Sequence, residues 1–156
     1  MVADSCSISI DLPDLAATEA LGRWIASGLR PGDALALYGE LGAGKTTLVR
    51  AILAALGVSE HVPSPTFTLV QSYETARLTV RHYDLYRIRS SAELAELGLE
   101  EALDEGAVLI EWPERAGEFL PQDALTIRLS GNQIRRADIT GPARWAAHSK
   151  DPTLVR

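Results

Sequence analysis

Cysteine, lysine and long apolar runs are scarce in this sequence, and each scarcity excludes a class of protein. One cysteine, Cys6, stands among 156 residues, so no internal disulfide can form and a reducing cytoplasm is the expected compartment. No apolar run approaches the roughly 18–20 residues that span a bilayer. The segment Met1–Asp4 lacks the basic start and the apolar run of a signal peptide. We therefore expect a cytoplasmic protein without a membrane segment.

The shortage of lysine bears on which ligands the chain could bind. Lysine occurs only at positions 45 and 150, and neither belongs to an Asn-Lys-x-Asp motif, so the guanine-reading motif of GTP-binding switches is missing. The formal net charge of −6 argues against a domain that binds nucleic acid through phosphate contacts alone.

Four arginines gather near the C-terminus, namely Arg128, Arg135, Arg136 and Arg144. A solvated face is the favoured interpretation, and a docking edge for an acidic partner or RNA is the alternative.

The length and the composition fit one folded domain. A chain of 156 residues with 46% hydrophobic and 23% charged residues can form a single core. Residues 1–142 carry the helix and strand patterns, so we expect one domain there. Residues 143–156 show no clear pattern and are expected to form a loosely held tail.

A glycine-rich phosphate-binding loop is the most informative motif of the chain. It consists of Gly39, Glu40, Leu41, Gly42, Ala43, Gly44, Lys45 and Thr46. The apolar run before it is typical of a buried parallel strand, and the helix predicted after it begins at Thr47. The glycines let backbone N–H groups surround phosphates, Lys45 reaches the β- and γ-phosphates, and the Thr46 hydroxyl binds Mg²⁺. The helix N-terminus adds positive potential. The sequence therefore predicts a nucleoside-triphosphate site.

Two acidic residues could complete a magnesium site beside this loop. Such a site needs an acid at the C-terminal end of a neighbouring parallel strand, and Glu111 is the best candidate because it follows a fully apolar run. Asp84 closes another predicted strand and is the next candidate, as a water-activating group. The plainer alternatives are a strand-end acid facing water for Glu111 and a turn-forming aspartate for Asp84. His82 and Trp112 are interpreted, from the residues alone, as packed side chains.

The remaining patterns predict the elements around the two buried strands. Alternating apolar residues predict further strands, apolar spacing after Asp14 predicts a helix to about Ser27, and Ser90–Glu93 has the pattern of a capping box that begins a short helix. The predicted strands are 5–12, 34–38, 67–73, 78–83, 107–110, 125–129 and 136–140. The pair 67–73 and 78–83 predicts a hairpin. We expect an α/β, single-domain P-loop NTPase fold with a mixed, partly antiparallel sheet flanked by helices.

Five motifs together resemble one protein family. They are GELGAGKTT (39–47), SPTFTL (64–69), HYDLYR (82–87), ELGLEEAL (96–103) and EWPERAG (111–117). In this order they resemble the TsaE family, also called YjeE, the small P-loop ATPases of bacterial tRNA threonylcarbamoyladenosine synthesis. The resemblance covers the chain from about Leu12 to Leu129. Glu40 and Tyr83 depart mildly from the family pattern, which more often has Asp and Phe there.

The resemblance implies roles for individual residues. It implies an ATP site in which Thr46 and Glu111 hold Mg²⁺ and Asp84 is needed for turnover. Thr66, with its neighbours, would belong to a switch-like loop near the γ-phosphate. Trp112 would lie near the nucleotide or a partner surface.

The resemblance also implies partners. Family members work with the TsaD and TsaB proteins, which install the threonylcarbamoyl group on the adenosine beside the anticodon. The implied role is ATP hydrolysis that resets that complex, with tRNA reached only indirectly through it.

A small-molecule or nucleotide kinase is the alternative function. Such kinases usually carry an arginine-bearing lid, but Arg87 and Arg89 are the only arginine pair near the predicted switch, and no lid insertion is visible. No arginine finger is evident beside the γ-phosphate position either. We therefore expect slow hydrolysis by the isolated chain and stimulation by a partner.

Overall fold

The strands of this protein form one mixed sheet. The computed structural model describes residues 5–60, 62–63, 65 and 68–148. The strands in this part are β1 (Ser5–Leu12), β2 (Ala34–Tyr38), β3 (Val70–Glu74), β4 (Thr79–Asp84), β5 (Gly106–Glu111), β6 (Leu125–Ser130) and β7 (Arg135–Pro142). Their order across the sheet is β1-β7-β6-β2-β5-β4-β3. Pairing is parallel among β6, β2, β5 and β4 and antiparallel at both edges. The predicted mixed, partly antiparallel sheet is therefore confirmed.

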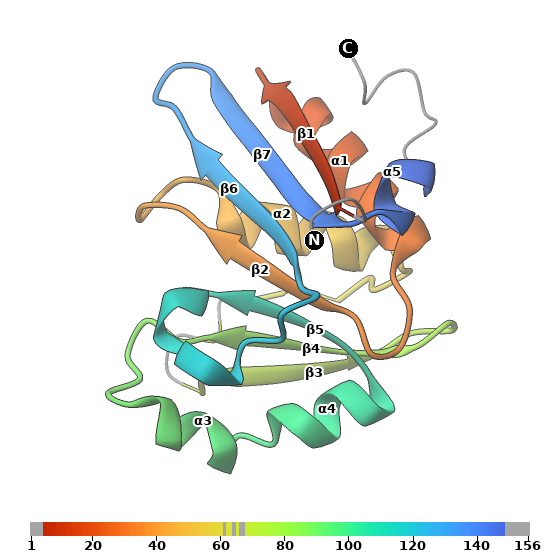
Figure 1. Cartoon of the computed structure of the whole chain (residues 1–156). Helices are drawn as coiled ribbons and strands as arrows, with labels where there is room; N and C mark the ends of the chain where they lie inside the picture. Colours follow the sequence, from red (N-terminus) through yellow and green to blue (C-terminus); the bar gives the residue numbers. More distant parts are fainter. Residues whose placement is uncertain (1–4, 61, 64, 66–67, 149–156) are drawn as a thin grey trace.

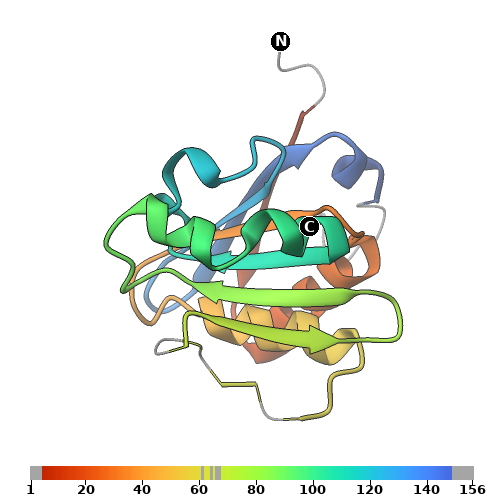
Figure 2. The same ribbon diagram turned by 90° about the horizontal axis from the view of Figure 1, so that it is seen from below.

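Helices cover both faces of the sheet (Figure 1). They are α1 (Leu15–Gly28), α2 (Lys45–Ala55), α3 (Ser91–Glu96), α4 (Leu99–Glu105) and α5 (Arg144–His148), with single 3-10 turns at η1 (Pro113–Arg115) and η2 (Gly117–Phe119). Helices α1 and α2 lie on one face and α3 and α4 on the other, as the view from below also shows (Figure 2). None of the helices in the described part of the chain combines the length and the apolar character needed to cross a bilayer.

The central strands are buried on both faces, which explains their unbroken apolar sequences. In β2, Leu35 and Leu37 belong to the core under α1 and α2, whereas Ala34 and Ala36 belong to the core under α3 and α4. This alternation follows from the two-residue period of a strand. The outer strand β1 instead buries one face only, in the alternating pattern that its sequence predicts.

Helices α1 and α2 pack closely beside the phosphate-binding loop. The Asp14 side chain accepts the Ala17 N–H at 2.9 Å and so caps α1, as predicted. A Cβ atom on Gly22 would lie 2.6 Å from the Cβ of Ala51, so only glycine allows this approach. The close contact fixes α2, and with it the loop that precedes α2.

One predicted local motif was wrong. Ser90 is the N-cap residue of α3, but its side chain makes no capping hydrogen bond. Glu93 accepts the N–H of Arg89 at 3.0 Å instead of that of Ser90, so the reciprocal pair of a capping box does not form. The helix begins at the predicted place nonetheless, with an acidic residue in its first turn.

The expected loose tail also needs correction. Within residues 143–156, the segment Arg144–His148 forms α5, and Trp145 is 2% exposed and packs 5.4 Å from Trp24 between ring centroids. The Arg144 guanidinium donates to Asp33 and to the Gly28 carbonyl. These residues therefore belong to the folded domain, and residues 149–156 lie outside the described part.

Candidate functional site

The phosphate-binding loop connects the C-terminal end of β2 to the N-terminal end of α2. Gly42 and Gly44 have φ angles of +80° and +103°, the left-handed region that glycine enters without strain. Gly44 is the N-cap residue of α2, so the first turn of the helix directs its free N–H groups toward the loop. An anion held there would meet both these donors and the helix dipole.

Lys45 is folded back over its own loop. Its side chain is 5% exposed, and Nζ donates to the carbonyl oxygen of Gly39 and lies 3.5 Å from that of Glu40. Nζ also lies 3.6 Å from the ring centroid of Trp112. Burial lowers the pKa of Lys45, and nearby carboxylates, Glu111 first, oppose that shift. The ammonium is thus held within the loop by carbonyl oxygens and an aromatic face.

Thr46 and Glu111 meet at the end of the parallel strands. Glu111 is the last residue of β5, which pairs with β2 so that Leu37 lies opposite it. The Thr46 hydroxyl lies 3.0 Å from each oxygen of the Glu111 carboxylate and donates to it. Glu111 is 3% exposed, so it is not the strand-end acid facing water of the plainer alternative.

Asp84 lies beside this pair. It ends β4 and is the register partner of Glu111 in the parallel pair of β4 and β5. Its side chain is buried, and Oδ1 accepts the N–H of Tyr86 at 3.1 Å. This local bond is the one that a turn-forming aspartate makes, and the same side chain lines a cavity with Lys45 and Thr46.

His82 contacts Glu111 from the interior of the protein. It is fully buried, as a packed histidine would be, and its Nε2 lies 2.6 Å from Glu111 Oε2. Sequence reasoning missed this pairing. Because side chains alternate along a strand, His82 in β4 does point to the same face as Asp84 two residues on, which was the available signal.

Trp112 follows Glu111 in a strained backbone conformation. Its φ of +58° and ψ of +50° lie in the left-handed region, which a bulky residue rarely adopts. The half-buried ring lies between the Lys45 ammonium and the Tyr86 ring, whose centroid is 4.9 Å away. The turn therefore places an aromatic face directly above the loop.

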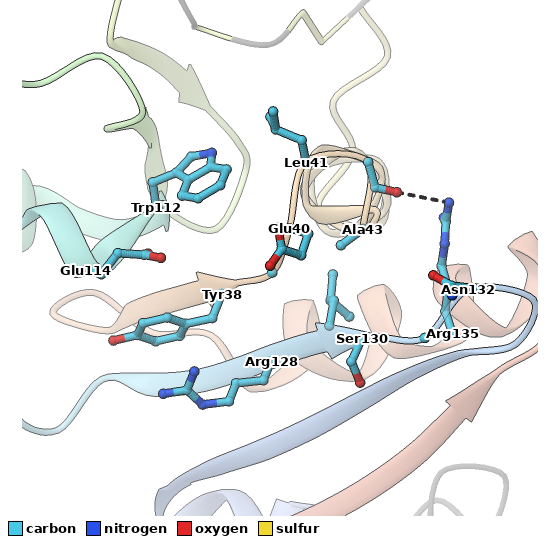
Figure 3. A pocket seen from close by; sticks show the side chains of 14 residues that line it. Tyr38, Glu40, Leu41, Ala43, Trp112, Glu114, Arg128, Ser130, Asn132 and Arg135 are labelled. Carbon is cyan, nitrogen blue, oxygen red and sulfur yellow. Dashed lines mark hydrogen bonds between the residues drawn. The ribbon is translucent and has the colours of Figure 1, made fainter.

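Two neighbouring cavities of about 630 Å³ and 330 Å³ open around the loop. The smaller is lined by Lys45, Thr46, Asp84 and Glu111, among others. The larger extends toward β6 and the β6–β7 turn, where Figure 3 shows Trp112 and Leu41 across from Arg128 and Ser130. Leu41, Gly42, Trp112 and Arg135 line both. The cavities thus form one continuous site with the loop at its centre.

Several arginines line this site, and the sequence analysis did not place them there. Arg135 donates from Nη2 to the Gly42 carbonyl oxygen at 3.2 Å, the dashed line in Figure 3, and Arg87 lines the smaller cavity. The Arg128 guanidinium lies 4.2 Å from the ring centroid of Tyr38 in the larger one. The C-terminal arginines are therefore not one solvated face. The absence of an arginine finger beside the γ-phosphate and slow turnover by the isolated chain both stay predictions.

The segment expected to act as a switch is only partly described. Ser64 and Thr66 lie outside the described residues, so the role predicted for Thr66 stays a prediction. The Leu69 N–H donates to the carbonyl oxygen of Pro65 at 2.7 Å, and the Leu69 carbonyl accepts the Asp84 N–H at 3.0 Å. Through Leu69, these two hydrogen bonds connect Pro65 of the predicted switch segment to the backbone of Asp84.

The residues present fit a magnesium–nucleotide complex. Mg²⁺ takes hard oxygen ligands, usually one or two carboxylates together with waters and substrate phosphates. The Thr46 hydroxyl and the Glu111 carboxylate supply such oxygens at one point, with Asp84 beside them. Among the described residues, no group of three or more His, Cys, Asp and Glu forms a metal cage, and a metal carried by phosphates needs none.

Comparisons with known proteins agree on one family. A family model described as "Threonylcarbamoyl adenosine biosynthesis protein TsaE" matches residues 12–138. A relative in Rickettsia felis is named tRNA threonylcarbamoyladenosine biosynthesis protein TsaE and is 42% identical over 113 residues. The match covers 72% of this chain and 66% of the relative, so this chain spans just under two thirds of the relative's length. A Bacillus subtilis protein of the same name is 38% identical, over 79% of this chain and 78% of that one.

A solved structure shares the fold. The crystal structure of Bacillus subtilis YdiB superposes with a TM-score of 0.77 at 30% sequence identity, and the match covers 92% of each chain.

Proposed function

The chain belongs to the TsaE family, and we propose that it is the Mg²⁺-dependent, ATP-hydrolysing subunit that supports the TsaD and TsaB proteins in threonylcarbamoylation of the adenosine beside the tRNA anticodon. One observation carries the proposal. The Thr46 hydroxyl and the buried Glu111 carboxylate lie 3.0 Å apart at the mouth of a phosphate-binding loop that contains Lys45.

The two cavities divide the work of nucleotide binding. In the smaller, the loop N–H groups and Lys45 bind the β- and γ-phosphates, while Thr46 and Glu111 hold Mg²⁺. The larger cavity has room for the nucleoside, beside the aromatic faces of Trp112 and Tyr38. Its volume lies within the 300–1,000 Å³ of ordinary small-molecule sites.

Hydrolysis then depends on the residues around the γ-phosphate. Bound Mg²⁺ supplies charge neutralisation to the phosphates when present. Asp84 would orient or deprotonate the attacking water. Its position beside Glu111 and in the lining of the smaller cavity supports this role. Lys45 must leave the carbonyls of Gly39 and Glu40 to reach a phosphate, and the exchange of neutral oxygens for charged ones favours that movement.

The proposal assigns the chain no chemistry on tRNA. The net charge of −6 favours docking to proteins over direct binding to the phosphate backbone. ATP hydrolysis here would reset the TsaD–TsaB complex between turnovers, and tRNA would be reached only through that complex.

The test is phosphate release from Mg-ATP by the wild type and by Glu111→Gln, each with and without purified TsaB and TsaD. We expect low turnover alone, a sharp rise with the partners, and loss of turnover in Glu111→Gln. Lys45→Ala should abolish nucleotide binding. Glu118→Gln is the matched control, because Glu118 is exposed and lines neither of the two cavities. Turnover indifferent to the partners would contradict the proposal, and phosphoryl transfer to a small-molecule acceptor would favour the kinase alternative.

A further inference from the structure

The two oxygens of the Glu111 carboxylate are held unequally. Oε1 accepts a hydrogen bond from the Thr46 hydroxyl at 3.0 Å. Oε2 has the same hydroxyl at 3.0 Å and also His82 Nε2 at 2.6 Å. A hydroxyl has a single hydrogen to donate, so the shorter bond from His82 is the one that decides how the carboxylate is turned.

His82 is fixed by the sheet rather than by a loop. It lies in the middle of β4, is the register partner of Leu109 in β5, and is 0% exposed. Glu111 lies two residues after Leu109, so the two side chains share a face of adjacent parallel strands. Both backbones are held by ladder hydrogen bonds, which leaves the imidazole little freedom relative to the carboxylate.

The hydrogen-bonding state of the imidazole follows from its partners. A carboxylate oxygen only accepts, so His82 Nε2 carries the hydrogen and donates it to Oε2. The other ring nitrogen, Nδ1, is buried and has no hydrogen-bond partner among the described residues. The ring is therefore held in place by packing and by its bond to Glu111. A leucine of similar size could provide the packing alone.

We propose that His82 is a positioning residue for the magnesium ligand Glu111. Its Nε2–H holds Oε2 and thereby presents Oε1, next to the Thr46 hydroxyl, to the metal. The inference rests on the proposed function, because it concerns the metal that accompanies the nucleotide. If the Thr46 hydroxyl oxygen is given to the metal, the bond from His82 would still hold Glu111 Oε2.

The cost of losing this bond has a known scale. Partners that orient metal ligands from behind change metal affinity by about 10–100-fold when they are removed. Two variants separate orientation from packing. His82→Leu keeps an apolar side chain in the space but removes the donor. His82→Gln places an amide N–H₂ at about the same reach as the imidazole Nε2 and restores the donor.

The experiment measures Mn²⁺, as a paramagnetic substitute for Mg²⁺, binding to the protein–ADP complex by electron paramagnetic resonance. ADP affinity in EDTA is measured in parallel by calorimetry. We expect His82→Leu to weaken Mn²⁺ binding about 10-fold or more, with ADP affinity in EDTA nearly unchanged, and His82→Gln to recover most of the loss. Thermal unfolding of each variant shows whether it is folded, and His82→Asn, whose shorter amide cannot reach Glu111, replaces His82→Leu if the latter does not fold.

The outcomes distinguish this inference from the proposed function. Equal Mn²⁺ affinity in the wild type and in the donor-free variant overturns the positioning role while the magnesium site stands. A loss that His82→Gln fails to recover overturns it too, because packing would then explain the effect. A wild type whose ADP complex binds no Mn²⁺ when the metal is supplied contradicts the magnesium part of the proposed function, and this inference with it.

Discussion

The guanidinium of Arg135 donates a hydrogen bond across 3.2 Å to the carbonyl oxygen of Gly42. This bond joins the first residue of β7 to the middle of the phosphate-binding loop, 93 positions earlier in the chain. Arg135 lines both cavities of the site, and an added Cβ on Gly44 would lie 3.0 Å from its Nη1. A permanent positive charge therefore lies beside the phosphate-binding loop.

We expect Arg135→Gln to weaken ADP binding about 10-fold or more, because a hydrogen bond to a charged group contributes about 1.5–3 kcal/mol. Calorimetric titration with ADP measures the change. Arg136→Gln is the matched control. Arg136 is the next residue on β7, points to the opposite face, and bonds to Ser9 and Asp138 away from the site. Equal losses in both variants would mean that only the general positive potential matters.

Local sequence patterns predicted the centre of the site, because the loop, its strand and its helix are consecutive in the chain. Glu111 was also predictable, since a buried apolar strand that ends in an acid is itself a local pattern. Arg135 was not, and for His82 the alternation along its strand indicates only that it shares a face with Asp84, not that it bonds to Glu111. Arg135 reaches the loop only because β6 lies between β7 and β2, and His82 meets Glu111 only through the register of β4 and β5. Strand order and register are tertiary properties that a single sequence does not display.

The misjudged tail has a similar cause. A five-residue helix has no stability of its own, so its sequence carries no visible period. What holds α5 is the burial of Trp145 against Trp24 and the ion pair between Arg144 and Asp33. Both contacts join residues more than 100 positions apart, and neither is visible before the fold is known.

Asp84→Asn should separate hydrolysis from binding. The amide keeps an oxygen for the Tyr86 N–H but cannot take a proton from water. We expect ATP turnover in the presence of the partners to fall by about 100-fold or more, the usual contribution of a general base, with ADP affinity little changed. Steady-state phosphate release and calorimetry measure the two quantities. A parallel fall in ADP affinity would instead place Asp84 among the groups that bind the nucleotide.

Nucleotide binding should be visible in the emission of Trp112. Its half-buried ring lines both cavities and lies 3.6 Å from Lys45 Nζ, which must move when phosphate binds. The other two tryptophans, Trp24 in α1 and Trp145 in α5, pack against each other. We expect ADP to change the fluorescence of the wild type and to leave that of Trp112→Phe unchanged. A signal that survives in Trp112→Phe would show a conformational change reaching the distant pair.

Trp145→Ala tests whether α5 belongs to the folded domain. Trp145 is 2% exposed and also contacts the His148 ring, with centroids 5.7 Å apart. Truncating a buried tryptophan to alanine typically costs about 3–5 kcal/mol of unfolding free energy. Urea unfolding followed by circular dichroism measures the difference. Ala146→Ser, at an exposed position of the same helix, is the control and should change stability little. A cost near zero for Trp145→Ala would restore the loose tail that the sequence predicts.

Acid should weaken the pairing of β1 with β7 through Asp138. The Ser9 hydroxyl donates to its carboxylate at 2.6 Å and is the main cause that holds the pKa of Asp138 below its ordinary value, with the bond from Arg136 a smaller one. A carboxyl whose pKa is lower in the folded state stabilises that state above the unfolded pKa, and this contribution is lost as the pH falls through the folded pKa. At an exposed site in ordinary salt it amounts to about 1 kcal/mol or less.

The expected result is therefore a difference in unfolding free energy between the wild type and Asp138→Asn that is largest near neutral pH and shrinks as the solution is acidified toward the ordinary aspartate range. Urea titrations across that range measure it. Repeating the comparison in a Ser9→Ala background removes the main cause of the shift, so most of the pH dependence should vanish there. If it persists in that background, the Arg136 pair and not the cross-strand hydroxyl sets the acid sensitivity of this edge of the sheet.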